Sequence, residues 1–355
     1  MPRPSFPSPP VRPAALAAAL AAALTACASR PACPDQHLPP PAVAGPWTSA
    51  VGRDHPLVGQ VYEVRSKRFV EAAALEAAVA GAHFVLLGET HDNPDHHRLQ
   101  ARLVRAAAAN GRRPALAFEM LDTSQQAAVD AAVASPDRTA DSVALAVAWA
   151  KSGWPAFDLY RPIFAAGLEA RLPLVAANLP RKVVRQAVES GESALPGALR
   201  ERLAREPPLA PAERDALRKE MGESHCGKLP DEMFDPLILA QRARDAEMAE
   251  RLVRADAGQG AILIAGAGHV RNDRGVPAHL ARDPQAKASV AVAFLEARPE
   301  RCTAADYAED LDVKALPFDY VVFTPGAERE DPCKAMKVPK HPPPPAEPPA
   351  TGTAL

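Results

Sequence analysis

The stretch "HFVLLGETHDNPDHH", residues 83–97, decides the fold. Its first half is continuously apolar, which is typical of a strand covered on both faces of a sheet. The run ends abruptly in Glu89-Thr90-His91, and Asn93-Pro94 then supplies a helix N-cap and a proline suited to the first turn. The stretch therefore predicts a buried strand, a polar turn that can carry chemistry, and a helix.

The same alternation recurs along the chain, and no internal repeat accompanies it. Further helix starts are indicated by a capping box, Thr123 with Gln126, and by the Asp235-Pro236 pair. This order predicts an α/β fold with a mostly parallel central sheet of about six strands sandwiched by helices. The expected strands are 83–89, 114–120, 172–178, 261–268, 289–296 and 319–325.

The composition is that of a globular protein and excludes two classes of partner. The chain has 355 residues, of which 47% are hydrophobic and 24% charged, and its net charge is −2. Such a balance gives no electrostatic footprint for nucleic acid or for an anionic membrane surface.

The N-terminal segment resembles a lipoprotein leader. Two arginines precede "AALAAALAAALTAC", whose apolar part is too short to span a bilayer and fits a signal-peptide core. Leu24 to Cys27 resembles a lipobox, which predicts cleavage before Cys27 and acylation of that cysteine. Ala28 and Ser29 follow it without an aspartate, which favours the outer membrane. A secretory leader that happens to contain a cysteine is the alternative.

Proline-rich segments flank the predicted domain. We expect a signal peptide at 1–26, a tether at 27–55, an α/β domain at 56–326 and a disordered tail at 327–355. Of the remaining cysteines, Cys302 and Cys333 lie on either side of the last predicted strand and are one option for a disulfide. The sequence leaves the pairing open. It contains no Cys-x-x-Cys pair, which argues against a thiolate zinc site.

Polar residues terminate four of the predicted strands. In a parallel α/β sheet, ligands bind at the carboxyl ends of the strands, so these side chains belong together. Each alone is more often a cap or a turn residue, but Glu119 stands inside an apolar run, where a carboxylate needs a partner or a raised pKa. The residues are Glu89, His91, Glu119, Asn178, Arg181 and His269.

Arg181 and several further polar and aromatic residues are less certain members of the predicted site. Arg181 lies in the first helical turn after Pro180, where a cation opposes the helix dipole and suits a carboxylate of Glu89, of Glu119 or of a ligand. Tyr160 belongs to an aromatic segment that is mostly core, and His225 lies in the loop "ESHCGKLPDEMFDP". Asp245 and the His96-His97 pair favour structural roles, because they accompany buried helix stripes.

Taken together, the motifs resemble the ChaN-like haem-binding lipoproteins of the Tiki, TraB and erythromycin esterase superfamily. They are "LLGETHDNPDHHRLQ", "FEM", "ANLPR", "SHCGKLP", "AQRARDAEMA" and "AGAGHVRNDRGVP", and the resemblance covers about residues 56–326. It implies haem binding, a role in iron acquisition at the outer membrane, and site residues Gly88, Glu89, His91, Glu119 and His269. The chain departs at Ala267, where relatives often carry asparagine.

Three hypotheses follow. The first is a haem-binding lipoprotein of the outer membrane, with cofactor-binding residues among His91, Tyr160, Asn178, Arg181, His225 and His269. The second is a hydrolase with Glu89, His91 and Glu119 as catalytic residues, or with a divalent metal on His91, Glu119 and His269. The third is a stabilising hydrogen-bond network in an anchored interaction protein. A homodimer and outer-membrane haem or iron transport proteins are candidate partners, and the membrane is contacted through lipid on Cys27.

Overall fold

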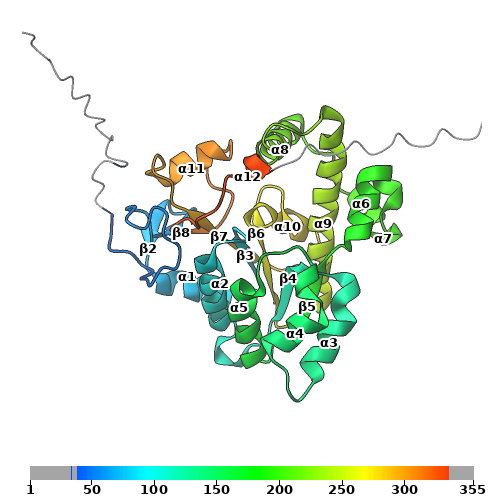
Figure 1. The fold of residues 1–355 in the computed structure, drawn as a ribbon, viewed down its shortest axis with the longest axis horizontal. Helices are drawn as coiled ribbons and strands as arrows, with labels where there is room; N and C mark the ends of the chain where they lie inside the picture. The colour runs from blue at the N-terminus through cyan, green and yellow to red at the C-terminus, as the bar shows by residue number, and fades with distance from the viewer. Residues whose placement is uncertain (1–32, 34–37, 336–355) are drawn as a thin grey trace, which may run out of the picture. The chain divides into compact units, whose positions relative to one another are not determined.

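The computed structural model describes residue 33 and residues 38–335 (Figure 1). The expected signal peptide, Cys27, most of the N-terminal half of the tether and the end of the tail lie outside the described residues. Within the described part of the chain, no helix is both long and apolar enough to span a membrane.

The sheet is mostly parallel, as predicted, and has the strand order β2-β1-β8-β7-β3-β6-β4-β5. It contains eight strands instead of about six, because two three-residue strands add an antiparallel edge next to β8. Strands this short leave no apolar run in the sequence. The strands are β1 (Val61–Glu63), β2 (Arg68–Val70), β3 (Phe84–Glu89), β4 (Ala115–Asp122), β5 (Leu174–Asn178), β6 (Ala261–Gly266), β7 (Ser289–Glu296) and β8 (Tyr320–Thr324).

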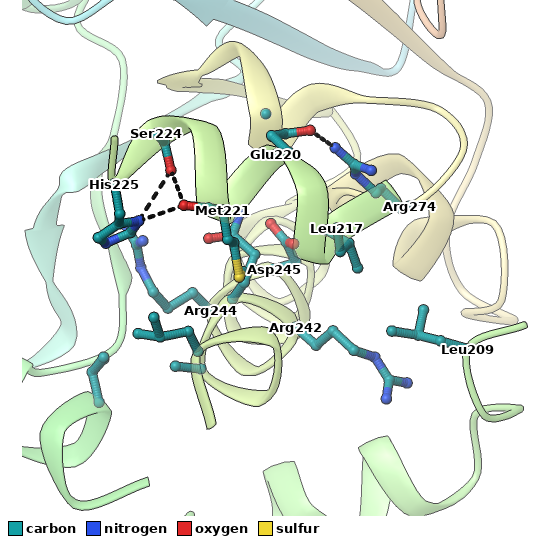
Figure 2. A pocket seen from close by; sticks show the side chains of 15 residues that line it. Leu209, Leu217, Glu220, Met221, Ser224, His225, Arg242, Arg244, Asp245 and Arg274 are labelled. Atoms are coloured by element: carbon teal, nitrogen blue, oxygen red, sulfur yellow. Dashed lines mark hydrogen bonds and ion pairs between the residues drawn. The ribbon is translucent and has the colours of Figure 1, made fainter. Parts of the chain in front are cut away.

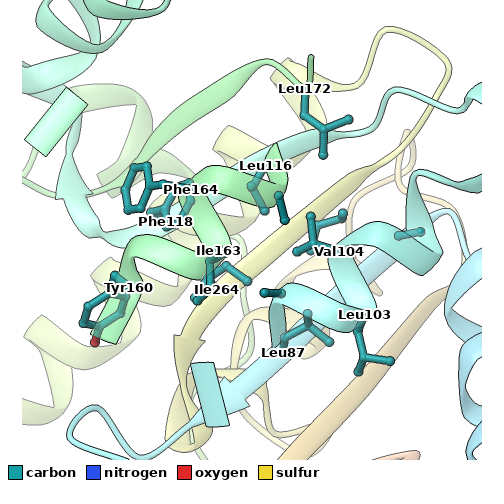
Figure 3. Packing of buried hydrophobic residues seen from close by; sticks show 14 of the residues in the cluster. Leu87, Leu103, Val104, Leu116, Phe118, Tyr160, Ile163, Phe164, Leu172 and Ile264 are labelled. Atoms are coloured by element: carbon teal, nitrogen blue, oxygen red, sulfur yellow. The ribbon is translucent and has the colours of Figure 1, made fainter. Parts of the chain in front are cut away.

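Helices cover both faces of the sheet, which explains why the strands are apolar at successive positions. Along β3, Val85 and Leu87 pack into the core under α1 to α5, while Phe84 and Leu86 pack into the core on the other face, under α9 to α11. Figure 3 shows Leu87 and Ile264 within the first of these two cores. The helices on that side are α1 (Ala72–Gly81), α2 (Pro94–Ala107), α3 (Gln126–Ala134), α4 (Ala140–Ala146) and α5 (Phe157–Glu169).

The second face carries the longest helix and a smaller helical cluster. The helices α6 and α7 pack on α9 through Ala187, Leu199 and Leu203. A short 3-10 segment, η6 (Ala267–Val270), follows β6 directly. The remaining helices are α6 (Arg181–Ser190), α7 (Gly197–Ala204), α8 (Pro211–Ser224), α9 (Phe234–Ala255), α10 (Val276–Leu280), α11 (Ala304–Asp310) and α12 (Pro332–Ala335).

The predicted helix starts are confirmed in one case and shifted in the others. The Asn93 side chain accepts hydrogen bonds from the backbone N–H groups of Asp95 and His96, so it caps α2 as predicted. The capping box lies one residue earlier than expected, on Asp122 and Gln125. The helix α9 begins at Phe234, so Asp235 and Pro236 lie inside its first turn instead of preceding it.

The disulfide pairing differs from the option that the sequence suggested. Cys302 pairs with Cys33, and Cys333 pairs with Cys226, with Cα–Cα distances of 5.3 and 5.6 Å. Proximity in sequence misled the prediction, because each of these cysteines pairs with one much farther away along the chain, at separations of 269 and 107 residues. Each disulfide instead ties a chain end to the body.

The described part of the expected tether lies against the body. The backbone N–H groups of Thr48 and Ser49 donate to the buried carboxylate of Asp95, and Val51 pairs with Gly326 in an isolated bridge. Val43 is buried, and its N–H donates to the carbonyl of Gly59. Thr48 and Ser49 therefore cover the start of α2, and the residues on either side of them are attached to the body.

Candidate functional site

The polar residues predicted to terminate the strands meet where the carboxyl ends of β3, β4, β5 and β6 lie side by side. Glu89, the last residue of β3, is in register with Gly266, the last residue of β6. The register of β4 against β5 shifts between Phe118 and Asp122, which is where Glu119 lies. The parallel sheet thus gathers side chains from positions up to 180 residues apart in the sequence at one edge.

Glu89 is the centre of the first group of side chains. One carboxylate oxygen accepts a hydrogen bond from the Tyr160 hydroxyl at 2.8 Å and lies 3.0 Å from Nδ1 of His91. The other lies 2.8 Å from Nδ1 of His97. Glu89, His97 and Tyr160 are all buried, whereas the His91 side chain is 35% exposed. His91 is therefore the member of this group that solvent and ligands can reach.

Glu119 and His269 are the centre of the second group. Nε2 of His269 lies 3.2 Å from Glu119, and its Nδ1 lies 2.5 Å from Asp245. The same Glu119 carboxylate accepts hydrogen bonds from the backbone N–H of Gly266 at 2.7 Å and from the guanidinium of Arg244. Its lone pairs are thus occupied by donors from β6, α9 and η6.

Gly266 joins the two groups. A Cβ atom added there would lie 3.1 Å from Nε2 of His91 and 3.7 Å from a carboxylate oxygen of Glu119. The two side chains therefore lie next to the same backbone position. Gly88 has a related role, because a Cβ there would lie 2.3 Å from Val270 and 2.9 Å from the backbone of Ala267. Only glycine at position 88 lets the η6 turn that carries His269 approach β3 so closely.

The carboxylates and imidazoles of the site shift the pKa values of their neighbours. Burial acts to raise the pKa of Glu89, but the charge of His97 and hydrogen bonds from His91 and His97 lower that pKa to about 2. Burial acts to lower the pKa of His269, yet the carboxylates of Glu119 and Asp245 raise it to about 9. The pKa of His91 is also raised, because the hydrogen bond to Glu89 and the charges of Glu119 and Glu89 outweigh burial. The site therefore pairs carboxylates of lowered pKa with imidazoles of raised pKa.

Of the other predicted residues, Asn178 and Tyr160 contact Glu119 and Glu89, whereas Arg181 and His225 contact other parts of the protein. Asn178 is part of the site, since its amide donates to the Glu119 carbonyl at 2.8 Å and its side-chain oxygen accepts from Arg244. Tyr160 is fully buried, with its hydroxyl committed to Glu89. Arg181 is exposed and lies against Gly153, so Arg244, and not Arg181, is the cation paired with Glu119. His225 lies in the loop after α8 and lines a cavity that also borders Arg244 and Asp245.

Three functional neighbours carry little signal in the sequence. Arg244 and Asp245 lie on the buried face of α9, and their spacing alone does not show which strand they meet. The helix stripe predicts a packing role for both His96 and His97, but His97 contacts Glu89. The interpretation is correct for His96, whose ring bonds the Thr90 N–H and the Thr324 hydroxyl. His97 lies eight residues after Glu89 within α2, so its contact with the carboxylate became visible only in the packing.

Within the predicted metal trio, Glu119 and both ring nitrogens of His269 are already paired with other groups of the protein. Among the described residues, the group of three potential ligands whose donor atoms all lie within 4.8 Å consists of Cys33, His55 and Cys302, and not of His91, Glu119 and His269. Because Cys33 and Cys302 form a disulfide, their sulfur atoms are not thiolates. The divalent metal stays a prediction.

A cavity of about 260 Å³ adjoins the second group (Figure 2). Gln241, Arg244 and Asp245 from α9 form part of its lining, together with Gly268 from η6. Gln241 and Asp245 contact the His269 ring, and Arg244 contacts Glu119. The wall of the cavity is thus made of the side chains that hold the buried pair in place.

Fold and site define a class of α/β protein in which a parallel sheet presents paired carboxylates and imidazoles at one edge. Comparison with known families assigns the class more closely. The family described as "Haem-binding uptake, Tiki superfamily, ChaN" matches residues 75–280, and the chain belongs to this family. The match spans every motif of the site from Glu89 to His269.

Solved structures agree on the fold. The chain is similar to ChaN of Campylobacter jejuni, a structure described as showing cofacial haem binding, with a TM-score of 0.56 and 20% sequence identity over 74% of this chain and 95% of that one. An erythromycin esterase in its open conformation is similar at 14% identity over 77% of this chain and 99% of that one, but its TM-score of 0.43 is too low to support an argument. Among curated proteins, none matched the chain.

Proposed function

We propose that this protein binds haem at the His91 end of the site, with Nε2 of His91 as the axial ligand to the iron. The observation that carries the proposal is that the two nitrogens of the His91 ring have different surroundings. Nδ1 is held by the buried carboxylate of Glu89, which fixes the ring, while Nε2 lies beside Gly266 and has no hydrogen-bond partner among the described residues. A carboxylate behind the ring increases the basicity of the remaining nitrogen, as in other metal-bound histidines.

The other imidazoles at this edge are committed to partners within the protein. His269 uses one nitrogen for Glu119 and the other for Asp245. His97 uses one for Glu89 and the other for the His91 carbonyl. Tyr160 would have to leave both Glu89 and the core to reach an iron atom. The donor set therefore fits a single histidine ligand.

The surroundings of His91 fit a flat, apolar ligand that carries carboxylates. The half-buried Trp154 packs edge-on against the His91 ring, with 4.9 Å between ring centroids. Arg181 lies against the neighbouring Gly153, where a Cβ atom would be 3.2 Å from its guanidinium. Trp154 offers an aromatic wall for the macrocycle and Arg181 a cation for a propionate. Bound haem would supply a Lewis-acidic and redox-active iron.

A haemin titration tests this proposal. The full-length chain should give a saturable shift of the Soret band, and His91→Ala should weaken binding by at least about tenfold, roughly 1.4 kcal/mol. His225→Ala is the matched control, because His225 is another partly exposed histidine outside the group around Glu89. A normal titration of His91→Ala would refute the assignment of the ligand, and an absent shift in the unaltered chain would refute haem binding.

We further propose that the protein acquires haem or iron at the outer membrane, anchored by lipid on Cys27. The family description supports haem uptake, and the lipobox-like sequence at Leu24 to Cys27 supports the anchor. Outer-membrane transport proteins and a second copy of the chain are the partners that such a role would use. The unaltered chain should incorporate a labelled fatty acid, and Cys27→Ser should not. The Cys27→Ser variant should also remain in the soluble fraction.

Hydrolysis is the alternative function, and the convergence of His91 and Glu119 on Gly266 is the observation that favours it. Glu119 is a poor general base, however, because three donors occupy its oxygens and its pKa is well below the usual value. His91 would have to act as the base after losing its proton. Metal analysis with an ester and peptide screen, comparing the unaltered chain with His91→Ala and Glu119→Gln, tests it. Hydrolysis is excluded if neither metal nor a difference in activity is found.

A further inference from the structure

The cavity beside α9 has an apolar body and a basic rim. Its apolar wall comes from α6, α8, α9 and the loop before α8, and consists of Val184, Leu209, Leu217, Met221, Leu237 and Ala240. Its polar lining includes three arginines, Arg242, Arg244 and Arg274, against the two carboxylates Glu220 and Asp245. In Figure 2, Arg242 and Arg274 approach the cavity from the side of Leu209, and Arg244 lies near His225.

Each of these arginines has N–H groups that make no hydrogen bond among the described residues. Among the described residues, Arg242 bonds Glu206 through one terminal nitrogen, and Arg274 bonds Glu220 through one terminal nitrogen. Arg244 uses two of its three nitrogens, for Asn178 and Glu119. A guanidinium carries five N–H donors, so all three keep N–H groups that a further acceptor can use. The existing ion pairs neutralise much of the charge, which suits a monoanion better than a multiply charged phosphate.

We propose that this cavity binds a small amphipathic monocarboxylate, with its apolar part among the leucines and its carboxylate at the arginines. The volume of about 260 Å³ corresponds to roughly nine water-sized volumes at about 30 Å³ each, which matches a ligand of about ten non-hydrogen atoms. A ligand of this size is much smaller than haem, and the inference does not depend on the proposed haem site.

The segment "ESHCGKLP" closes one end of the cavity. His225 and Ser224 form part of the lining, and the His225 ring bonds the Met221 carbonyl at the end of α8. The next residue, Cys226, has φ 59° and is joined by a disulfide to Cys333 near the C-terminus. This covalent tie holds the loop, and with it the end of α8, against the cavity. A preorganised cavity wall reduces the entropic cost of ligand binding.

Methionine methyl NMR of the full-length chain tests the proposal with octanoate as the probe. Met221 lines the cavity, whereas Met248 lies in the core under the sheet, so the two methyl groups report binding at the cavity and elsewhere. Octanoate should move the Met221 signal saturably and leave the Met248 signal in place. Octanol, which has the same chain without the charge, should bind at least about tenfold more weakly. No movement of Met221, or equal titration by octanol, would overturn the proposal.

Variants test the two halves of the cavity separately. Ala240→Leu adds side-chain volume within the cavity and should weaken octanoate binding at least tenfold, whereas Ala212→Leu makes the same change at an exposed position of α8 and should not. Arg274→Gln should weaken binding several-fold, whereas Arg214→Gln, which removes an exposed arginine of α8 paired with Asp235, should not. Equal affinities within both pairs of variants would show that octanoate binds elsewhere and would refute the site.

Discussion

Nδ1 of His97 lies 2.8 Å from the carboxylate of Glu89, and both side chains are fully buried. A histidine that the sequence places on a helix face thus contacts the acid that ends the central strand. Through Glu89, His97 is linked to His91, the exposed ring of the site. The stability and the proposed ligand chemistry of the protein are therefore coupled at this carboxylate.

Glu89→Gln should lower the free energy of unfolding at neutral pH. In acid, the difference in unfolding free energy between the variant and the unaltered chain should become smaller. The folded-state pKa of Glu89 is about 2, against an ordinary value of 4.5, so its contribution is present above pH 4.5 and is lost as the pH falls toward 2. The difference corresponds to about 3 kcal/mol. Urea unfolding at pH 7 and at pH 3 measures it. A constant difference at both pH values would contradict this account.

Because of His269, the free energy of unfolding should decrease as the pH rises above neutral. Its folded-state pKa of about 9 exceeds the ordinary 6.5, so its contribution is present below pH 6.5 and is lost as the pH rises toward 9. Unfolding free energies of the unaltered chain should decrease between pH 6.5 and 9 by up to about 3 kcal/mol. His269→Gln should lack most of this decrease. A variant with the same alkaline slope as the unaltered chain would show that other groups cause it.

Gly266→Ala should weaken haem binding at little cost in stability. The added methyl group would lie 3.1 Å from Nε2 of His91, so the ring must shift, while the backbone at Gly266 has φ −61°, which alanine adopts without strain. We expect about a tenfold loss of haemin affinity. Gly268→Ala is the control, because its methyl group would lie 3.8 Å from the nearest atom, a side-chain oxygen of Glu220. Equal haemin affinity of the two variants would argue against His91 as the ligand.

Tyr160→Phe distinguishes a supporting residue from an iron ligand. The hydroxyl donates to the ionised Glu89, and its loss should cost about 1.5–3 kcal/mol of stability. The haem spectrum should keep the position of its Soret band, because the proposed ligand is His91. Absorption spectra of the haem-loaded variant and its urea unfolding curve provide the two measurements. A changed spectrum with unchanged stability would identify Tyr160 as the ligand.

Peptide mapping without reduction should recover Cys33 joined to Cys302 and Cys226 joined to Cys333. The double variant Cys226→Ser with Cys333→Ser opens a loop of 107 residues and should lower the unfolding free energy by about 4–5 kcal/mol. A peptide that joins Cys302 to Cys333 would contradict the structure.

The sequence predicted much of the site because each residue is marked by its local context. Glu89, His91 and His269 follow apolar runs, and Glu119 interrupts one; parallel strands bring such positions to one edge whatever lies between them. The N-cap Asn93 is equally local, since it binds backbone groups two and three residues ahead. The two short strands β1 and β2 escaped prediction because three residues show no period.

By itself, then, the sequence determined the α/β class, the family and the four residues at the strand ends, since these depend on the hydrophobic pattern and on short motifs. Only the tertiary structure decided which cation meets Glu119, that His97 meets Glu89, which cysteines pair and where the cavity lies. Arg181 and Arg244 are both plausible partners in the sequence, but α9 crosses the end of β4 and directs Arg244 to Glu119, while Arg181 stays at the surface. Such contacts depend on how helices pack across the sheet, and packing joins residues whose separation along the chain carries no information about their distance.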